Sequence, residues 1–71
     1  MSNKVMQLSV NGKKRELPDG STVAELIAEL ALDPRMLAVE RNLELVPRAQ
    51  HSQTPLEEGD RVEVVTLVGG G

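Results

Sequence analysis

The residues with the clearest chemical potential are Gly69, Gly70 and Gly71, which follow the apolar run from Val65 to Val68. Glycine has no Cβ, so a glycine segment can pass through a channel that is too narrow for side chains. The functional group expected to react is the α-carboxylate of Gly71, which is ionised at neutral pH and is a poor electrophile. We therefore expect a partner enzyme to activate it, for instance as an acyl adenylate, and to supply the nucleotide, the metal and the geometry.

The remaining residues offer little to an enzyme mechanism. The 71-residue chain contains no cysteine, which excludes disulfides, thiolate nucleophiles and thiolate metal sites within it. His51 is the one histidine, and a lone histidine in a polar loop is expected to be a solvated surface residue. The acidic run of Glu57, Glu58 and Asp60 is interpreted as a solvated turn, with a docking contact as the alternative. We expect no catalytic residue, no metal ligand and no bound cofactor.

The charge balance argues against a nucleic acid as the partner. Eight Lys and Arg against eleven Asp and Glu give a formal net charge of −3, and no aromatic side chain is present to stack on bases. The basic run Lys13-Lys14-Arg15 is interpreted as protection of a sheet edge rather than as a binding patch. Because no apolar stretch has the length of a signal peptide or a membrane span, we expect no membrane contact and a cytoplasmic location.

These groups must be positioned by a small domain, and its first element is predicted to be a β-hairpin. The apolar residues of VMQLSV alternate along the chain, and Asn11-Gly12 follows as a strong hairpin signal. A two-residue turn would place Leu8 opposite Arg15, whereas a four-residue loop would pair Leu8 with Leu17. Both registers agree with the sequence.

A helix is predicted to follow the hairpin. Thr22 and Glu25 have the spacing of a capping box, which indicates that the helix begins at about Thr22. Pro34 requires the helix to have ended before it. One apolar stripe at helical spacing would pack against the sheet: Val23, Leu26, Ile27 and Leu30.

Three strands are predicted in the second half of the chain. Two short strands, roughly 37–40 and 44–46, flank a turn at Asn42, and Pro47 restricts the second of them to a sheet edge or to very short length. Leu56 is the single apolar anchor of the polar segment that follows. The run RVEVVTLV has the highest β-branched content, and we expect it to lie beside the first strand as a central parallel pair.

The last strand is expected to present apolar groups on both of its faces. Val62 and Val64 would face the helix, which leaves Val65 and Leu67 on the uncovered face of the sheet. Because an uncovered face normally carries polar groups, we predict an apolar docking patch formed by Val65, Leu67 and Val68 with residues of the third and fourth strands.

The order of elements predicts a single α+β domain over residues 1–71. We expect a mixed sheet of four to five strands with one main helix packed on one face. Residues 68–71 would form an exposed and flexible C-terminal glycine tail.

Four segments, in their order and spacing, resemble the ThiS-type sulfur carrier proteins of thiamine biosynthesis, which have the ubiquitin-like β-grasp fold. The segments are VNGKKRELPDGSTVAELI, AVERNLELVPR, TPLEEGDRVEVV and TLVGGG, and the resemblance covers the chain from about Met6 to Gly71. It implies that Gly71 is adenylated by an ATP-dependent enzyme related to the enzymes that activate ubiquitin. The adenylate would then become a thiocarboxylate, with sulfur from a source such as a cysteine desulfurase, and thiazole synthase would use that sulfur to build the thiazole ring. The activating enzyme and thiazole synthase would be the partners that dock on the open sheet face.

Two positions depart from the pattern of this family. The turn after the third strand usually reads Asn-Gly, whereas this chain has Asn42-Leu43. Because leucine tolerates positive φ poorly, we expect a longer turn or another turn type there. Leu67 stands where the family often has an aromatic residue, and it keeps an apolar contact.

Two related functions and one of another class are alternatives. The small subunit of molybdopterin synthase and ubiquitin-like modifiers of lysine share activation at the terminal glycine, so the tail does not separate them from a thiamine sulfur carrier. The VPR sequence from Val46 to Arg48 and the short length favour the thiamine branch by resemblance. The third alternative is a passive interaction domain in which the glycines are inert.

Overall fold

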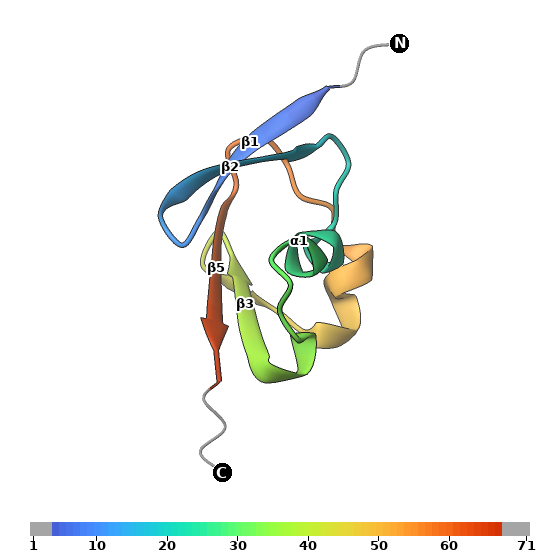
Figure 1. The fold of residues 1–71 in the computed structure, drawn as a ribbon, viewed down its shortest axis with the longest axis vertical. Coiled ribbons are helices and arrows are strands. Elements are labelled where there is room, and N and C mark those ends of the chain that lie inside the picture. Colours follow the sequence, from blue (N-terminus) through green and yellow to red (C-terminus); the bar gives the residue numbers. More distant parts are fainter. Residues whose placement is uncertain (1–3, 68–71) are drawn as a thin grey trace.

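The computed structural model describes residues 4–67, and these form one five-stranded mixed sheet with one α-helix on one face (Figure 1). The strands are β1 (Val5–Val10), β2 (Lys13–Pro18), β3 (Leu37–Arg41), β4 (Glu44–Val46) and β5 (Arg61–Thr66). The helix is α1 (Val23–Glu29), and two short 3-10 helices are η1 (Pro34–Met36) and η2 (Arg48–Gln53). The predicted α+β architecture is confirmed, whereas the predicted tail at 68–71 lies outside the described residues.

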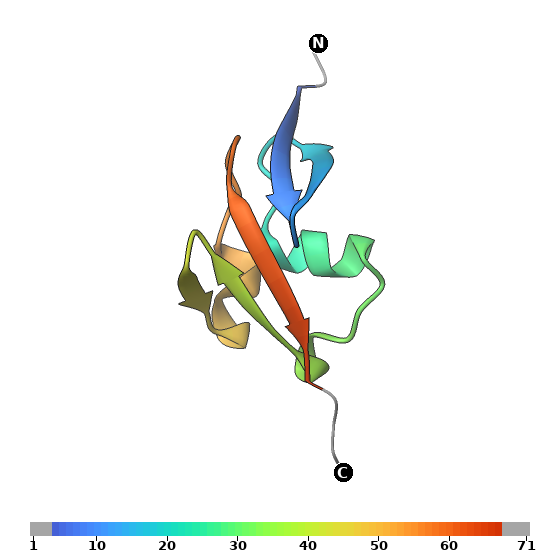
Figure 2. The ribbon, with the colours of Figure 1, turned by 90° about the vertical axis from the view of Figure 1, so that its left-hand side faces the viewer.

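The strand order is β2-β1-β5-β3-β4, which places β5 at the centre of the sheet. β5 pairs in parallel with β1, with Val10 opposite Val62, and antiparallel with β3, with Val39 opposite Val64. Figure 2 shows β5 crossing the full length of the sheet between these two neighbours. The predicted central parallel pair is confirmed, and both β2 with its basic run and β4 before Pro47 are edge strands.

The first hairpin has the two-residue turn. Asn11 and Gly12 have φ of 52° and 81°, and Leu8 lies opposite Arg15. Positive φ at both central residues is the geometry that matches the twist of the two strands, and Asn-Gly is the sequence that adopts it most easily. Of the two registers that the sequence allowed, the structure therefore has the one set by the two-residue turn.

The helix begins where the capping box predicts. The Thr22 hydroxyl accepts a hydrogen bond from the Glu25 amide at 3.2 Å, and the Glu25 carboxylate accepts one from the Thr22 amide at 2.9 Å. Two amides that a helix N-terminus leaves without intrahelical partners are thereby satisfied. Within residues 4–67, no helix is long and apolar enough to cross a membrane.

The core between α1 and the sheet is entirely aliphatic. Its largest fully buried side chains are Met6, Leu26 and Ile27, and Leu56 is buried with them as predicted. The inward residues of β5, Val62 and Val64, complete the core from the centre of the sheet. Among the described residues, the core lies between positions 6 and 64, so the end of β5 projects beyond it.

The turn between β3 and β4 differs from the expectation. It is a two-residue turn in which Arg41 pairs with Glu44, and Asn42 and Leu43 have φ of 52° and 73°. The prediction of a longer turn or another type is wrong because tertiary contacts fix this geometry. The Asn42 amide donates to the Arg61 carbonyl at 2.7 Å, and the Asn42 side-chain oxygen accepts from the Arg61 amide at 2.9 Å.

His51 also differs from the expectation, because it is buried rather than solvated. Its side chain lies in η2, which packs beside α1, and the residue is only 5% exposed. Nε2 lies 3.1 Å from the Val46 carbonyl oxygen. The polar sequence around His51 suggested a solvated loop, but the 3-10 turn directs this one ring inward.

Candidate functional site

The candidate site is the end of β5, where the chain leaves the sheet. Val65 and Leu67 are 57% and 52% exposed, as the alternation of the sequence predicts. In Figures 1 and 2 this end of β5 lies beside η1, at the opposite end of the fold from the start of β1. Val68, Gly69, Gly70 and Gly71, which were predicted to complete the site, are outside the described residues.

The end of β5 is held on its β3 side by backbone pairing. The antiparallel ladder continues to the pair Leu37 and Thr66. One residue further, the Leu67 amide donates a hydrogen bond of 2.7 Å to the Met36 carbonyl. The chain is therefore fixed by backbone hydrogen bonds up to residue 67.

On the β1 side, a side chain takes the place of a strand. The parallel ladder stops at Val10 and Val62, and the Asn11 amide donates to the Val62 carbonyl at 2.9 Å. The Asn11 side chain then donates from Nδ2 to the Val64 carbonyl at 3.2 Å, and its Oδ1 accepts from the Val64 amide at 2.8 Å. The carboxamide thus acts as an additional peptide group at the edge of β5.

Asn11 is the positioning residue that sequence reasoning missed. The Asn-Gly pair indicated a turn. A turn alone accounts for an asparagine at this position, because asparagine tolerates positive φ. Its second role depends on the three-dimensional placement of β5, which lies more than fifty positions away in the chain. Only a prediction of the register between β1 and β5 could have revealed it.

The open face of the sheet carries a small apolar area at this end, which we call the open-face patch (Ala38, Leu45, Val65 and Leu67). Ala38 pairs directly with Val65, and Leu45 belongs to the same face through its pairing with Glu40. Leu45, Val65 and Leu67 are exposed large apolar side chains. The patch thus includes residues of the third and fourth strands.

Two carboxylates border the open-face patch. Glu40 and Glu63 are directly paired across β3 and β5 on the same face, and both are exposed. Like charges directly opposite each other on neighbouring strands destabilise a sheet. A positively charged group placed over this pair would relieve that repulsion.

Asp60 is a structural residue rather than part of a solvated acidic turn. It is 6% exposed and accepts hydrogen bonds from the Arg41 guanidinium at 2.8 Å, the Asn42 side chain at 3.0 Å and the Glu57 amide at 2.8 Å. Burial raises the pKa of this carboxyl, but the hydrogen bonds from Asn42, Glu57 and Arg41 outweigh it, so the pKa lies below its ordinary value. The carboxylate joins the β3–β4 turn to the start of β5.

The described part of the chain offers no arrangement that would hold a metal. No three His, Asp or Glu side chains gather in it closely enough to ligate an ion. The geometry is that of a strand end with an apolar surface beside it.

Comparison with known proteins gives matches over nearly the whole chain. The family model that matches is that of the ThiS family, over residues 5–71. The sulfur carrier protein ThiS of Bacillus subtilis is 34% identical over 65 residues, which is 90% of this chain and 98% of that protein. A thiazole synthase of Paramagnetospirillum magneticum is 44% identical over 66 residues, or 93% of this chain, but the chain spans only 20% of that protein's length.

A solved structure has the same fold. The crystal structure of a thiamine biosynthesis protein (ThiS) from Geobacter metallireducens matches with a TM-score of 0.80 and 33% sequence identity. The match covers 93% of this chain and 100% of that one. The predicted β-grasp fold is thereby confirmed.

Proposed function

Because the chain belongs to the ThiS family, we propose that it is a sulfur carrier protein of thiamine biosynthesis. The observation that carries the proposal is the family match, which runs through the glycines to Gly71. The likeness to the Bacillus subtilis sulfur carrier extends over almost the whole of that protein, which supports a shared role for the complete domain. In this role the chain is a substrate of other enzymes and not a catalyst, and it is located in the cytoplasm.

In the proposed cycle the reacting group is the α-carboxylate of Gly71. A carboxylate oxygen attacks the α-phosphorus of ATP held by the activating enzyme, which forms an acyl adenylate and releases pyrophosphate. A thiol reductant releases hydrosulfide from the persulfide that a cysteine desulfurase forms, and the thiol is oxidised to a disulfide. The hydrosulfide then attacks the carbonyl carbon and AMP departs. The product is a thiocarboxylate on Gly71, so the sulfur travels on the backbone of a chain that has no cysteine of its own.

The fold supports this cycle by fixing the start of the reactive segment. β5 is paired on both sides up to Val64 and on one side to Leu67, so the position of residue 67 is defined relative to the open face. A partner that binds the open-face patch would therefore receive the glycines at a defined place. Preorganisation of this kind lowers the entropic cost of bringing two reacting groups together.

Thiazole synthase is the proposed acceptor of the sulfur. A segment 44% identical to this chain is part of a thiazole synthase, so a domain of this kind occurs in the same polypeptide as that activity. Covalent linkage raises the effective concentration of one partner at the other, which suits a carrier and its acceptor. The activating enzyme and the desulfurase belong to the proposal through the family resemblance.

The proposal is tested by the intact mass of the chain ending at Gly71. After incubation with the cognate activating enzyme, ATP and a sulfide source, the mass should increase by the difference between one sulfur and one oxygen atom, and fragmentation should place the change on Gly71. Omitting ATP should leave the mass unchanged. A chain with Gly71 intact that is never converted would contradict the proposal.

Two further experiments, one with thiazole synthase and one with a glycine variant, identify the pathway and the role of the glycines. Adding thiazole synthase with its other substrates should consume the thiocarboxylate, whereas consumption by a molybdopterin precursor instead would assign the chain to the molybdopterin branch.

Gly70→Leu should prevent activation, because a side chain would block a narrow channel. Its unfolding transition should not change, because the core formed by residues 4–67 is complete without the glycines, with its members between positions 6 and 64.

A further inference from the structure

The hydrogen bonds of β5 alternate between its two neighbours. In an antiparallel pair the N–H and C=O of one residue point to the same side, and the next residue points to the opposite side. The Leu67 amide donates to the Met36 carbonyl, and the register with β3 runs on from there without interruption. Residues 63, 65 and 67 therefore bond toward β3, whereas residues 62, 64 and 66 point toward the β1 side.

Thr66 is the residue whose backbone groups remain free on the β1 side. The Val62 carbonyl accepts from the Asn11 amide, and both backbone groups of Val64 are bonded to the Asn11 side chain. Thr66 comes next and is exposed, and within residues 4–67 no hydrogen bond reaches its N–H or C=O from this side. Unpaired N–H and C=O groups at a strand edge are a template for another strand.

A hollow of about 330 Å³ lies beside this edge, on the helix side of the sheet. Val64 and Thr66 line it from β5, and Leu30 and Leu32 line it from the end of α1 and the segment that follows. Alternate side chains of a strand point to the same face of a sheet. In a strand paired with Thr66, one side chain would therefore enter this hollow.

The rim of the hollow is basic. Lys13, Lys14 and Arg15 of β2 line it, no Asp or Glu of the described chain does, and none of the three forms an ion pair within residues 4–67. Arg15 lies opposite the core residue Leu8, so Arg15 and Lys13 are on the helix side of β2. Opposite charges attract across an interface and like charges are rejected. The hollow therefore selects an acidic side chain.

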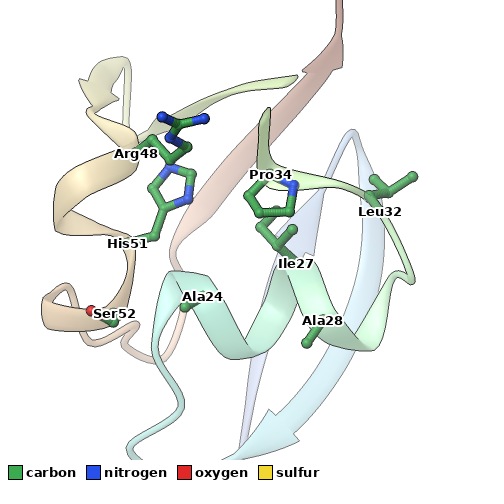
Figure 3. A pocket seen from close by; sticks show the side chains of 8 residues that line it. All are labelled: Ala24, Ile27, Ala28, Leu32, Pro34, Arg48, His51 and Ser52. Carbon is green, nitrogen blue, oxygen red and sulfur yellow. The ribbon is translucent and has the colours of Figure 1, made fainter. Parts of the chain in front are cut away.

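The other hollow on the helix side, of about 320 Å³ between α1 and η2, lacks this combination (Figure 3). None of its lining residues belongs to a strand, and the unpaired Nδ1 of His51 is fully buried, so it is closed to a ligand. The pKa of Asp33 lies below its ordinary value mainly because Arg35 donates hydrogen bonds to it, and the charge of Arg48 on this wall adds to the effect. The edge of β5 is thus the better binding surface.

We propose that an extended acidic segment of another protein adds to β5 at Thr66. Its backbone bonds to the Thr66 N–H and C=O, next to the Asn11 carboxamide, and one Glu or Asp side chain enters the hollow and pairs with Lys13 or Arg15. Strand addition of this kind draws affinity from the backbone and specificity from the side-chain pocket. The pairing does not require the chain to carry sulfur, so it stands independently of the proposed function.

The probe for the test is the pentapeptide Thr-Val-Glu-Val-Thr, acetylated and amidated at its ends, and the comparison peptide has Gln in place of Glu. Titration of the full chain, followed by ¹H–¹⁵N NMR spectroscopy, should shift the Thr66 amide signal and slow its exchange with water. The amides of Val65 and Leu67 point toward β3 and serve as internal references, because their exchange should change less. The Glu peptide should bind about threefold more tightly than the Gln peptide at low salt, as for one exposed ion pair, and this ratio should disappear at high salt.

Three results of the titration would overturn the proposal. The first is the absence of saturable shifts at Thr66 up to the solubility limit of both peptides. The second is an equal shift with sodium acetate, which would show a site for a bare carboxylate rather than for a strand. The third is a shift of Thr66 with protein concentration alone, which would assign the edge to a second copy of this chain.

Backbone variants separate the N–H of Thr66 from its side chain. Thr66→Pro removes the N–H without breaking a hydrogen bond within residues 4–67, and the residue before proline stays extended, so the fold should be retained and peptide binding lost. Thr66→Val is the matched control, because it keeps the N–H and should bind both peptides like the parent. Binding of both peptides by a folded Thr66→Pro would refute the pairing.

Charge variants test the hollow separately. Lys13→Glu should remove the preference for the Glu peptide, because an acidic side chain then lies at the rim. Lys4→Glu changes the net charge equally at an exposed residue before β1, outside the hollow, and should keep the preference. An unchanged preference in Lys13→Glu, or its loss in both variants, would refute the assignment of the hollow.

Discussion

Single residues determine how firmly the end of β5 is held, and Asn11 is the clearest case. The same side chain that tolerates a φ of 52° in the first turn also makes two hydrogen bonds to the backbone of Val64. A sequence pattern explains the first role, whereas the second extends β5 pairing beyond the point at which β1 ends. This residue therefore links the geometry of the turn to the presentation of the strand end.

Asn11→Gly separates these two roles, because glycine keeps the positive φ and removes the side-chain hydrogen bonds, while it also raises the entropy of the unfolded chain. We expect the free energy of unfolding to fall by about 1 to 2 kcal/mol. Hydrogen exchange should become faster at the Val64 amide, which loses its acceptor. Chemical denaturation and native-state exchange measure the two effects. Unchanged exchange at Val64 would show that the Asn11 side chain does not hold β5.

Asp60 should make the stability of the protein sensitive to acid. Because hydrogen bonds lower its pKa in the folded state, the carboxylate stabilises the fold above the unfolded pKa of about 3.9, and this contribution is lost as the pH falls through the lower folded value. Asp60→Asn should therefore be less stable than the parent at pH 7 by about 1 to 3 kcal/mol, with a difference that shrinks below about pH 4.

Urea denaturation over a series of pH values measures this difference. The exposed turn residue Asp19 provides the control, because its carboxylate makes no hydrogen bond or ion pair within residues 4–67. Asp33 also has a pKa below its ordinary value, through its hydrogen bonds with Arg35, but both variants retain it. A constant difference between the parent and Asp60→Asn across the acid range would exclude the predicted linkage.

At the scale of elements, the sequence predicts most where a local signal and the tertiary structure agree. The capping box of Thr22 and Glu25 locates the start of α1, and the β-branched run locates β5 at the centre of the sheet. The prediction fails where contacts with residues distant in the sequence determine the local conformation. Asn42 adopts its turn because it bonds to Arg61, and His51 turns inward because η2 packs beside α1. Neither cause is visible within a short window of sequence.

The β3–β4 turn stores strain at Leu43, whose φ is 73° and whose side chain is exposed. Leu43→Gly should raise the free energy of unfolding by about 1 kcal/mol, because relief of the left-handed strain exceeds the greater entropy of glycine in the unfolded chain. Leu43→Ala is the matched control, since it removes the exposed apolar atoms but keeps the Cβ that causes the strain. Equal stabilisation in both variants would attribute the gain to the lost apolar surface instead. Thermal and urea unfolding distinguish the two outcomes.

On the scale of the whole molecule, the two faces of the sheet differ in what covers them. α1 closes the core on one face and borders the pocket at His51, while the other face remains open beside the end of β5. Alternation along the last strand was sufficient to predict the exposure of Val65 and Leu67. The opposition of Glu40 and Glu63 required the strand register, and so it could not be read from the sequence.

Two valines test whether the open-face patch is a docking surface. Val65 and Val5 lie on the same face and are 57% and 53% exposed, but Val65 is at the end of β5 and Val5 at the start of β1. Val65→Gln should raise KM for the activating enzyme about tenfold, because an apolar contact is lost within a proposed interface. Val5→Gln should leave KM unchanged, and both variants should unfold within about 0.5 kcal/mol of the parent, as is usual for surface substitutions. Adenylation assayed by ATP–pyrophosphate exchange gives the comparison, and equal effects of the two substitutions would place the docking surface elsewhere.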